Sequence, residues 1–166
     1  MVPRQHPPSL AVLPTEVAIE IIGHLAATSE QPMDDLRSLW ATCSFMLRMC
    51  GDPAVGRHVA LDRFSRAMLW NKPDGYDTLL ASLTQVGNPE ACFLTGIQVI
   101  FRETHSPRLC LDDLARAAAG GLNVAAYLVA LFLYRDNGGA SDDDTARRYM
   151  RRVQGEEESW VAAAVD

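Results

Sequence analysis

The strongest constraint on the fold of this chain is an internal repeat in its second half, at an interval of 34 residues. The paired positions share size and polarity: Leu80 with Leu114, Ala81 with Ala115, Gly87 with Gly121, Ala91 with Ala125, Phe93 with Tyr127, Leu94 with Leu128, and Ile97 with Leu131. Each unit reads as a helix, a glycine-containing turn and a second helix. Small residues where helices cross allow their backbones to approach closely. The repeat therefore predicts stacked antiparallel helical hairpins over residues 75–153, the last of them a single helix over 142–153.

The N-terminal third predicts further helices. Aliphatic residues recur every four positions along its first part, at Leu13, Val17, Ile21 and Leu25, and Ala18 and Ile22 widen the same stripe. Pro14 and Glu16 are typical of a helix start, so a helix is expected over 13–25. After a loop at 27–33, apolar residues again step by three or four, at Leu36, Leu39, Trp40, Cys43, Met46, Leu47 and Cys50. This spacing predicts a second helical stretch, which Gly51 and Pro53 would end.

The remaining segments are expected to connect or flank these helices. Residues 1–11 read as a disordered leader, 59–74 as a linker, and 154–166 as a tail, and a short helix followed by an irregular segment is expected over residues 54–72. The turn-forming sequence Pro73-Asp74-Gly75 marks the expected boundary before the repeats. The predicted fold class is all-α.

The N-terminal motifs resemble an F-box over residues 12–58. They comprise Leu13-Pro14-x-Glu16, Ile21, Leu25, Asp35-Leu36 and Cys43-Ser44-Phe45. The first loop is longer than in the family pattern, and the aromatic residue after Cys43 comes one position early. The resemblance implies a helical trio whose apolar surface is covered by a Skp-type linker protein, and through it a cullin. The residues implied at or just beneath that interface are Leu13, Pro14, Ile21, Leu25, Leu36, Leu39 and Cys43.

The segments 87–91 and 114–127 resemble Sel-like repeats, which are relatives of the tetratricopeptide family. Combined with the F-box, this resemblance points to a plant family of ligase adaptors. Arrays of helical hairpins bind proteins or peptides on their exposed faces. Candidate contacts for a target protein are Phe93, Tyr127, Arg148 and Tyr149. The alternative for the aromatic residues is that they fill the hairpin core, and the array itself could serve only to stabilise the F-box.

Composition and motif searches exclude several other functions. The net charge of −6 disfavours binding of nucleic acid or an anionic membrane, and the longest apolar stretch, 124–134, is too short to span a bilayer. The four cysteines form no C-x-x-C motif and no zinc-ligand spacing, which favours reduced thiols in the cytoplasm or nucleus. The histidines accompany no nucleophile motif or phosphate loop. We expect no enzymatic activity, no metal and no cofactor.

These observations predict a substrate-recognition adaptor of a Skp–cullin–F-box ubiquitin ligase. Its N-terminal helices would bind the linker protein, and its helical repeats would bind an unknown protein target. The alternative is a non-ligase helical-repeat scaffold, or a shortened decoy that competes for the linker protein.

Overall fold

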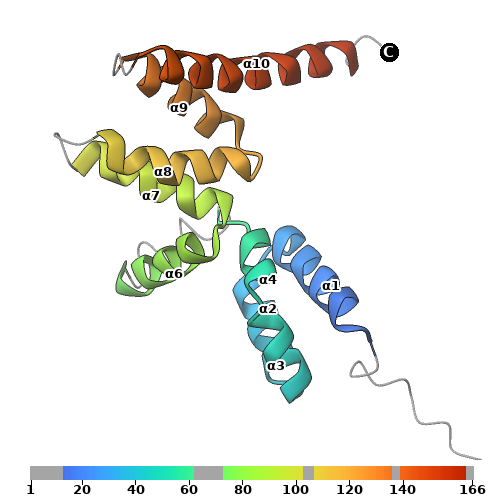
Figure 1. Ribbon diagram of the computed structural model, residues 1–166. Helices are drawn as coiled ribbons and strands as arrows, with labels where there is room; N and C mark the ends of the chain where they lie inside the picture. Colours follow the sequence, from blue (N-terminus) through green and yellow to red (C-terminus); the bar gives the residue numbers. More distant parts are fainter. Residues whose placement is uncertain (1–12, 62–72, 103–106, 136–138, 164–166) are drawn as a thin grey trace, which may run out of the picture. The chain divides into compact units, whose positions relative to one another are not determined.

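The computed structural model describes residues 13–61, 73–102, 107–135 and 139–163, and every regular element in these ranges is a helix (Figure 1). The predicted all-α class is therefore confirmed for the described part of the chain. Two compact units divide after Pro73. The predicted leader and most of the predicted linker lie outside the described residues. No helix in these ranges combines the length and the apolar character that a membrane crossing requires.

The N-terminal unit contains four helices, α1 (Thr15–Thr28), α2 (Pro32–Trp40), α3 (Ser44–Cys50) and α4 (Pro53–His58). Helix α1 packs against each of the other three. The buried apolar side chains of this unit are Ala18, Ile22, Ala26, Leu36, Met46, Cys50, Val55, Val59 and Leu61. Several of them are small, so the helices approach closely around a core of modest volume.

The predicted second helical stretch is wrong in one respect, because the chain breaks at Cys43. Residue Cys43 is extended, with φ −164° and ψ 164°, and precedes the first residue of α3. Thr42 ends α2 by donating both its backbone N–H (3.0 Å) and its hydroxyl (2.7 Å) to the carbonyl oxygen of Leu39. These hydrogen bonds satisfy the end of one helix before the next begins.

The predicted end of the helical stretch is confirmed, because Gly51 is the C-cap of α3. Pro53 then begins the short helix α4, which Asp52 caps by accepting the backbone N–H of Ala54 on its Oδ1 at 2.8 Å. The expected loop at 27–33 is shorter, since α1 continues to Thr28 and α2 begins at Pro32. Proline fits the first position of a helix, where its missing N–H costs no hydrogen bond.

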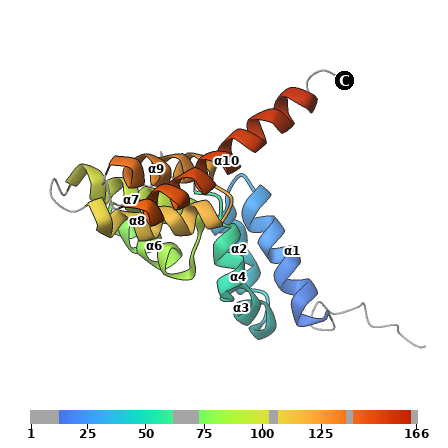
Figure 2. The ribbon, with the colours of Figure 1, turned by 45° about the horizontal axis from the view of Figure 1, so that its top comes forward.

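The C-terminal unit contains α6 (Pro73–Val86), α7 (Pro89–Arg102), α8 (Pro107–Ala119), α9 (Asn123–Arg135) and α10 (Ala140–Ala163). Helices α7 and α8 lie side by side in both views (Figures 1 and 2), α8 packs on α9, and α9 packs on α10. The Pro73-Asp74-Gly75 sequence is the start of α6 rather than a turn. Helix α10 extends from Ala140 to Ala163, well beyond the predicted 142–153.

The 34-residue interval is visible in the helix boundaries themselves. Helices α6 and α8 begin at Pro73 and Pro107, and α7 and α9 begin at Pro89 and Asn123. The turn within each pair contains a glycine with positive φ, +83° at Gly87 and +105° at Gly121. This backbone conformation is one that glycine adopts without steric cost, so the same turn is made in both units.

Small side chains hold the helices of the C-terminal unit together at short range. Its central cluster consists of Cys92, Ala117, Ala118, Ala125 and Ala126, none of which is exposed. Gly96 of α7 lies so close to Leu114 of α8 that an added Cβ would come within 2.9 Å of Leu114 Cγ. The Arg116 guanidinium of α8 donates to the carbonyl oxygens of Thr84 and Gln85 at the end of α6. Helices α6 and α8 are thereby linked directly.

Candidate functional site

Helix α1 buries only one side of the apolar stripe that its spacing predicts. Its core face consists of Ala18, Ile22 and Ala26, all at most 2% exposed. Val17 and Ile21 remain 40% and 55% exposed. At 100° per residue, these two side chains lie on one flank of the helix, next to the buried stripe. Helix α1 thus presents an apolar flank that no described part of the N-terminal unit covers.

Helices α2 and α3 leave further apolar side chains exposed. Trp40, the last residue of α2, is 40% exposed, and Leu47 of α3 is 53% exposed. We refer to Val17, Ile21, Trp40 and Leu47 as the exposed apolar set of the N-terminal unit. Single exposed apolar residues are ordinary, but these four are large for a unit of this size, and they come from three helices that pack on one another, α1, α2 and α3.

The residues that the F-box resemblance implies for linker binding fall into three groups. Pro14, Ile21 and Cys43 are exposed, and Leu13, Leu25 and Leu39 are half-buried. Leu36 is only 4% exposed, so it supports the surface from beneath. Val17, Trp40 and Leu47 are missing from the implied set. Their apolar character was evident in the sequence, but their exposure depends on how the four helices pack.

Cys43 is chemically distinct from the other three cysteines. It is exposed, and its interaction with the backbone N–H of Met46, with further help from the N–H of Phe45 and the Thr42 side chain, lowers the pKa of its thiol. Cys50, Cys92 and Cys110 are buried, and burial raises the pKa of each. A thiolate reacts where a thiol does not, so Cys43 combines access with reactivity.

We expect iodoacetamide to alkylate Cys43 at least about tenfold faster than any other cysteine at neutral pH. The lowered pKa raises the thiolate fraction of Cys43, whereas burial both blocks the other thiols and keeps them protonated. Mass spectrometry of peptides from the briefly treated protein measures this directly. In Cys43→Ser protein the fast reaction should disappear. Equal labelling of all four cysteines in the folded chain would contradict the described burial.

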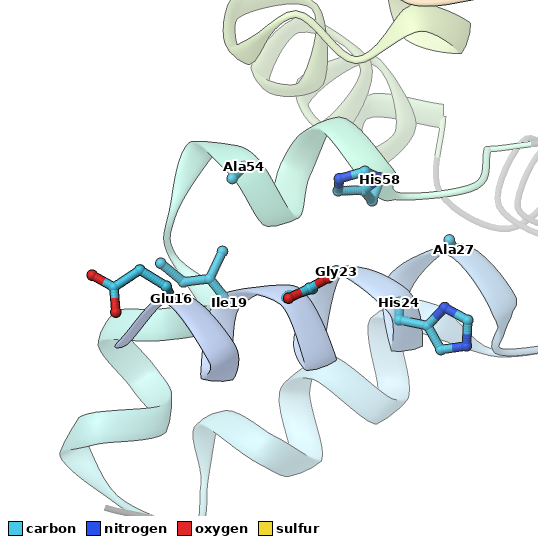
Figure 3. Close-up of a pocket in the computed structure, with 8 residues that line it drawn as sticks. Glu16, Ile19, Gly23, His24, Ala27, Ala54 and His58 are labelled. Carbon is cyan, nitrogen blue, oxygen red and sulfur yellow. The ribbon is translucent and has the colours of Figure 1, made fainter. Parts of the chain in front are cut away.

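A groove of about 530 Å³ lies between α1 and α4 (Figure 3). Its walls combine two carboxylates, two imidazoles and four small or aliphatic residues: Glu16, Ile19, Glu20, Gly23, His24, Ala27, Ala54 and His58. Gly23 lets the His58 ring approach, since an added Cβ would lie 3.1 Å from His58 Cδ2. Sequence reasoning missed this groove, because the packing of α4 on α1 is not encoded in either helix alone. Among the described residues, no group of three or more His, Cys, Asp or Glu side chains could hold a metal ion.

The four candidate target contacts do not form one surface. Phe93 and Tyr149 are half-buried and pack against the central cluster, as the core-filling alternative predicts. Tyr127 and Arg148 are exposed. Arg148 and Tyr149 line a shallow hollow of about 270 Å³ with Thr145 and Arg152 of the same helix. Around it the arginines 147, 148, 151 and 152 all face solvent, with Arg147 paired to Asp144 at 3.5 Å.

The described surfaces thus comprise exposed apolar side chains on α1, α2 and α3, and a groove between α1 and α4 that two carboxylates and two imidazoles line. No family model, curated protein or solved structure matches this chain.

Proposed function

We propose that this chain is an F-box-type adaptor of a Skp–cullin–F-box ubiquitin ligase. In this proposal the N-terminal unit docks on a Skp-type linker protein, and the C-terminal unit, read as Sel-like helical hairpins, holds a protein target. The observation that carries the proposal is the exposed apolar set Val17, Ile21, Trp40 and Leu47. A surface of this kind on a small helical unit favours coverage by a second polypeptide.

The energetics support docking rather than independent function of the N-terminal unit. A unit of about 60 residues buries too little apolar surface to be more than marginally stable by itself. Each member of the exposed apolar set has roughly half of its side chain in solvent. Covering all four would gain on the order of 4 kcal/mol from burial. Partner binding would add this gain to the low free energy of unfolding of the isolated unit. Folding and partner binding would therefore stabilise each other.

The repeats supply the second half of the proposal. Two helix pairs with the same interval and the same left-handed glycine turn support a solenoid-like array. Arrays of this kind present exposed helix faces to protein ligands, which suits a receptor that brings a target to a ligase. Tyr127 and Arg148 remain candidate target contacts because both are exposed.

Two substitutions in the full chain test the linker-binding surface. Ile21→Asp and Leu47→Asp should each weaken binding to a purified Skp-type linker protein by at least about 100-fold, because each would bury an unpaired charge in the interface. Both positions are exposed, so circular dichroism should show an unchanged helical content. Ser38→Asp is the matched control, since Ser38 is exposed on α2 and lies opposite the buried Leu36 on the helix. Isothermal calorimetry should give the control an affinity within about twofold of the wild type.

The outcomes separate the adaptor from its alternatives. Unchanged affinity of both Asp variants would place the linker elsewhere and contradict the proposed surface. An absence of binding by the wild-type chain itself would favour the non-ligase scaffold. Binding that competes with other adaptors, but never leads to ubiquitination of a protein held by the repeats, would favour the shortened decoy.

A further inference from the structure

The groove between α1 and α4 combines a charged end with a floor of small residues (Figure 3). Its α1 residues, from Glu16 to Ala27, recur at the three- and four-residue spacing of a single helix face. This face is about 16 Å long, at a rise of about 1.5 Å per residue. Gly23, Ala27 and Ala54 of α4 have little or no side chain, so the backbone of a ligand can approach them closely. The volume of about 530 Å³ is in the usual range for a ligand site between helices.

The charged end consists of two carboxylates that no described side chain neutralises. Glu16 and Glu20 lie four residues apart, so they are neighbours on the surface of α1 and repel one another. None of the ion pairs within the described ranges involves either of them. Cationic groups of a ligand would relieve this repulsion and would form charge-assisted hydrogen bonds with both carboxylates.

Apolar surface begins directly beside these carboxylates. Ile19 is half-buried and points toward α4, where Ala54 lies opposite it (Figure 3). Farther along, the ring of His58 approaches Gly23, where an added Cβ would lie 3.1 Å from His58 Cδ2. An arginine or lysine side chain suits this combination, because its aliphatic stem packs on apolar surface while its cationic head reaches a carboxylate.

We propose that the groove binds a basic segment of another protein in an extended conformation, with two cationic side chains on Glu16 and Glu20. The two glutamates are about 6 Å apart along the helix axis, and alternate residues of an extended chain are about 6.6 Å apart. Two arginines or lysines separated by one residue therefore match the two carboxylates. The groove admits about five extended residues. The close approach over Gly23 and Ala27 favours small residues in the remaining positions.

The groove lies on a different side of α1 from the exposed apolar set. At about 100° per residue, Val17 and Ile21 are roughly a third of a turn from the side that carries Glu16, Glu20 and Ala27. A protein can therefore cover the apolar flank while the groove remains accessible. The inference is independent of linker binding and adds a second recognition site to the N-terminal unit.

The exposure of the two glutamates sets the expected strength of binding. Both carboxylates face solvent, so each contact is partly screened and the affinity should be modest. We expect a Kd of about 10–100 µM at low ionic strength. General attraction of a basic peptide to a chain with a net charge of −6 is the alternative that the experiment must exclude.

Fluorescence anisotropy of a labelled peptide, Ala-Gly-Ala-Arg-Ala-Arg-Ala-Gly-Ala, titrated with the full chain tests the proposal. Glu16→Gln/Glu20→Gln protein should bind at least about tenfold more weakly than the wild type, because both charged contacts are lost. Asp77→Asn/Asp112→Asn is the matched control, since it removes two carboxylates from exposed positions on α6 and α8. It should bind within about twofold of the wild type. Ala54→Leu changes no charge but narrows the groove, and should weaken binding at least about fivefold with unchanged circular dichroism.

A peptide with citrulline in place of both arginines completes the experiment, because citrulline keeps the shape of arginine without its charge. The wild type should bind it at least about tenfold more weakly than the arginine peptide. The proposal is overturned if the wild type does not distinguish the two peptides, or if Glu16→Gln/Glu20→Gln protein binds as well as the control variant. Free arginine amide that binds as tightly as the peptide would also overturn it, since the groove would then hold a small cation rather than a protein segment.

Discussion

Leu114→Ala should lower the free energy of unfolding of the C-terminal unit by about 2–5 kcal/mol. Leu114 is fully buried, and it packs against Gly96 of α7. Truncation removes its apolar contacts and leaves a cavity, and the neighbouring glycine has no side chain with which to fill it. Urea denaturation followed by helical circular dichroism measures the loss.

The repeat and the surface provide controls for this prediction. Leu80 occupies the equivalent position one unit earlier and is 4% exposed, so Leu80→Ala should cost a similar amount. Leu131→Ala makes the same chemical change at a position that is 49% exposed and should change stability by less than about 1 kcal/mol at low protein concentration. Equal losses at Leu114 and Leu131 would contradict the described packing of α8.

Gly96→Val should destabilise the same unit by about 2–3 kcal/mol, although valine is the better helix former. The first added carbon alone would lie 2.9 Å from Leu114 Cγ and 3.0 Å from its Cδ2. Valine's second and third carbons would have to push α7 away from α8, since the backbone carbonyl of Cys110 is also only 3.4 Å from the Cβ position. Such a displacement would weaken the side-chain contacts between α7 and α8.

Gly155→Val is the matched control, because Gly155 also lies within a helix, yet an added Cβ would meet no atom within 4 Å. It should leave stability unchanged or raise it slightly, through helix propensity. The double variant Gly96→Val/Leu114→Ala should be less unstable than the sum of its single variants, since the shortened side chain makes room for valine. Strict additivity would show that the two residues do not share the same space.

Local patterns in the sequence were sufficient to predict the all-helical class and the 34-residue interval between the helix pairs. The Leu80/Leu114 and Gly87/Gly121 pairs carry this information, because a buried leucine and a left-handed glycine are requirements of single positions. The all-helical character follows from the same periodicities. The core-filling alternative for Phe93 and Tyr149 also agrees with their packing against the alanine cluster.

The apolar spacing alone does not predict the break at Cys43, because no glycine or proline marks it, and only the F-box resemblance implies a third helix in this stretch. The apolar spacing from Leu36 to Cys50 continues through it, and the hydrogen bonds of Thr42 that end α2 appear only once the chain has turned. Pro53 is ambiguous in the sequence, because a proline is compatible both with the residues after a helix end and with the first position of a new helix. In the structure it takes the second place, since Asp52 caps a helix that begins at Pro53.

The exposed apolar set depended on tertiary packing in the same way. Along α1 the aliphatic spacing is satisfied by two adjacent stripes, one through Val17 and Ile21 and one through Ala18 and Ile22. The second is buried because its small residues let α2, α3 and α4 approach. The sequence could not decide between them, since both stripes are aliphatic and each contains an isoleucine. The exposure of the first stripe is what makes α1 a candidate docking helix.

The rate of Cys43 alkylation in the full chain, measured with and without a saturating purified Skp-type linker protein, tests the adaptor proposal most directly. Cys43 is exposed and has a lowered pKa, so its reaction with iodoacetamide reports on what covers α3. The proposal predicts that the linker protein slows this reaction at least about tenfold. An unchanged rate at saturating linker protein would contradict it.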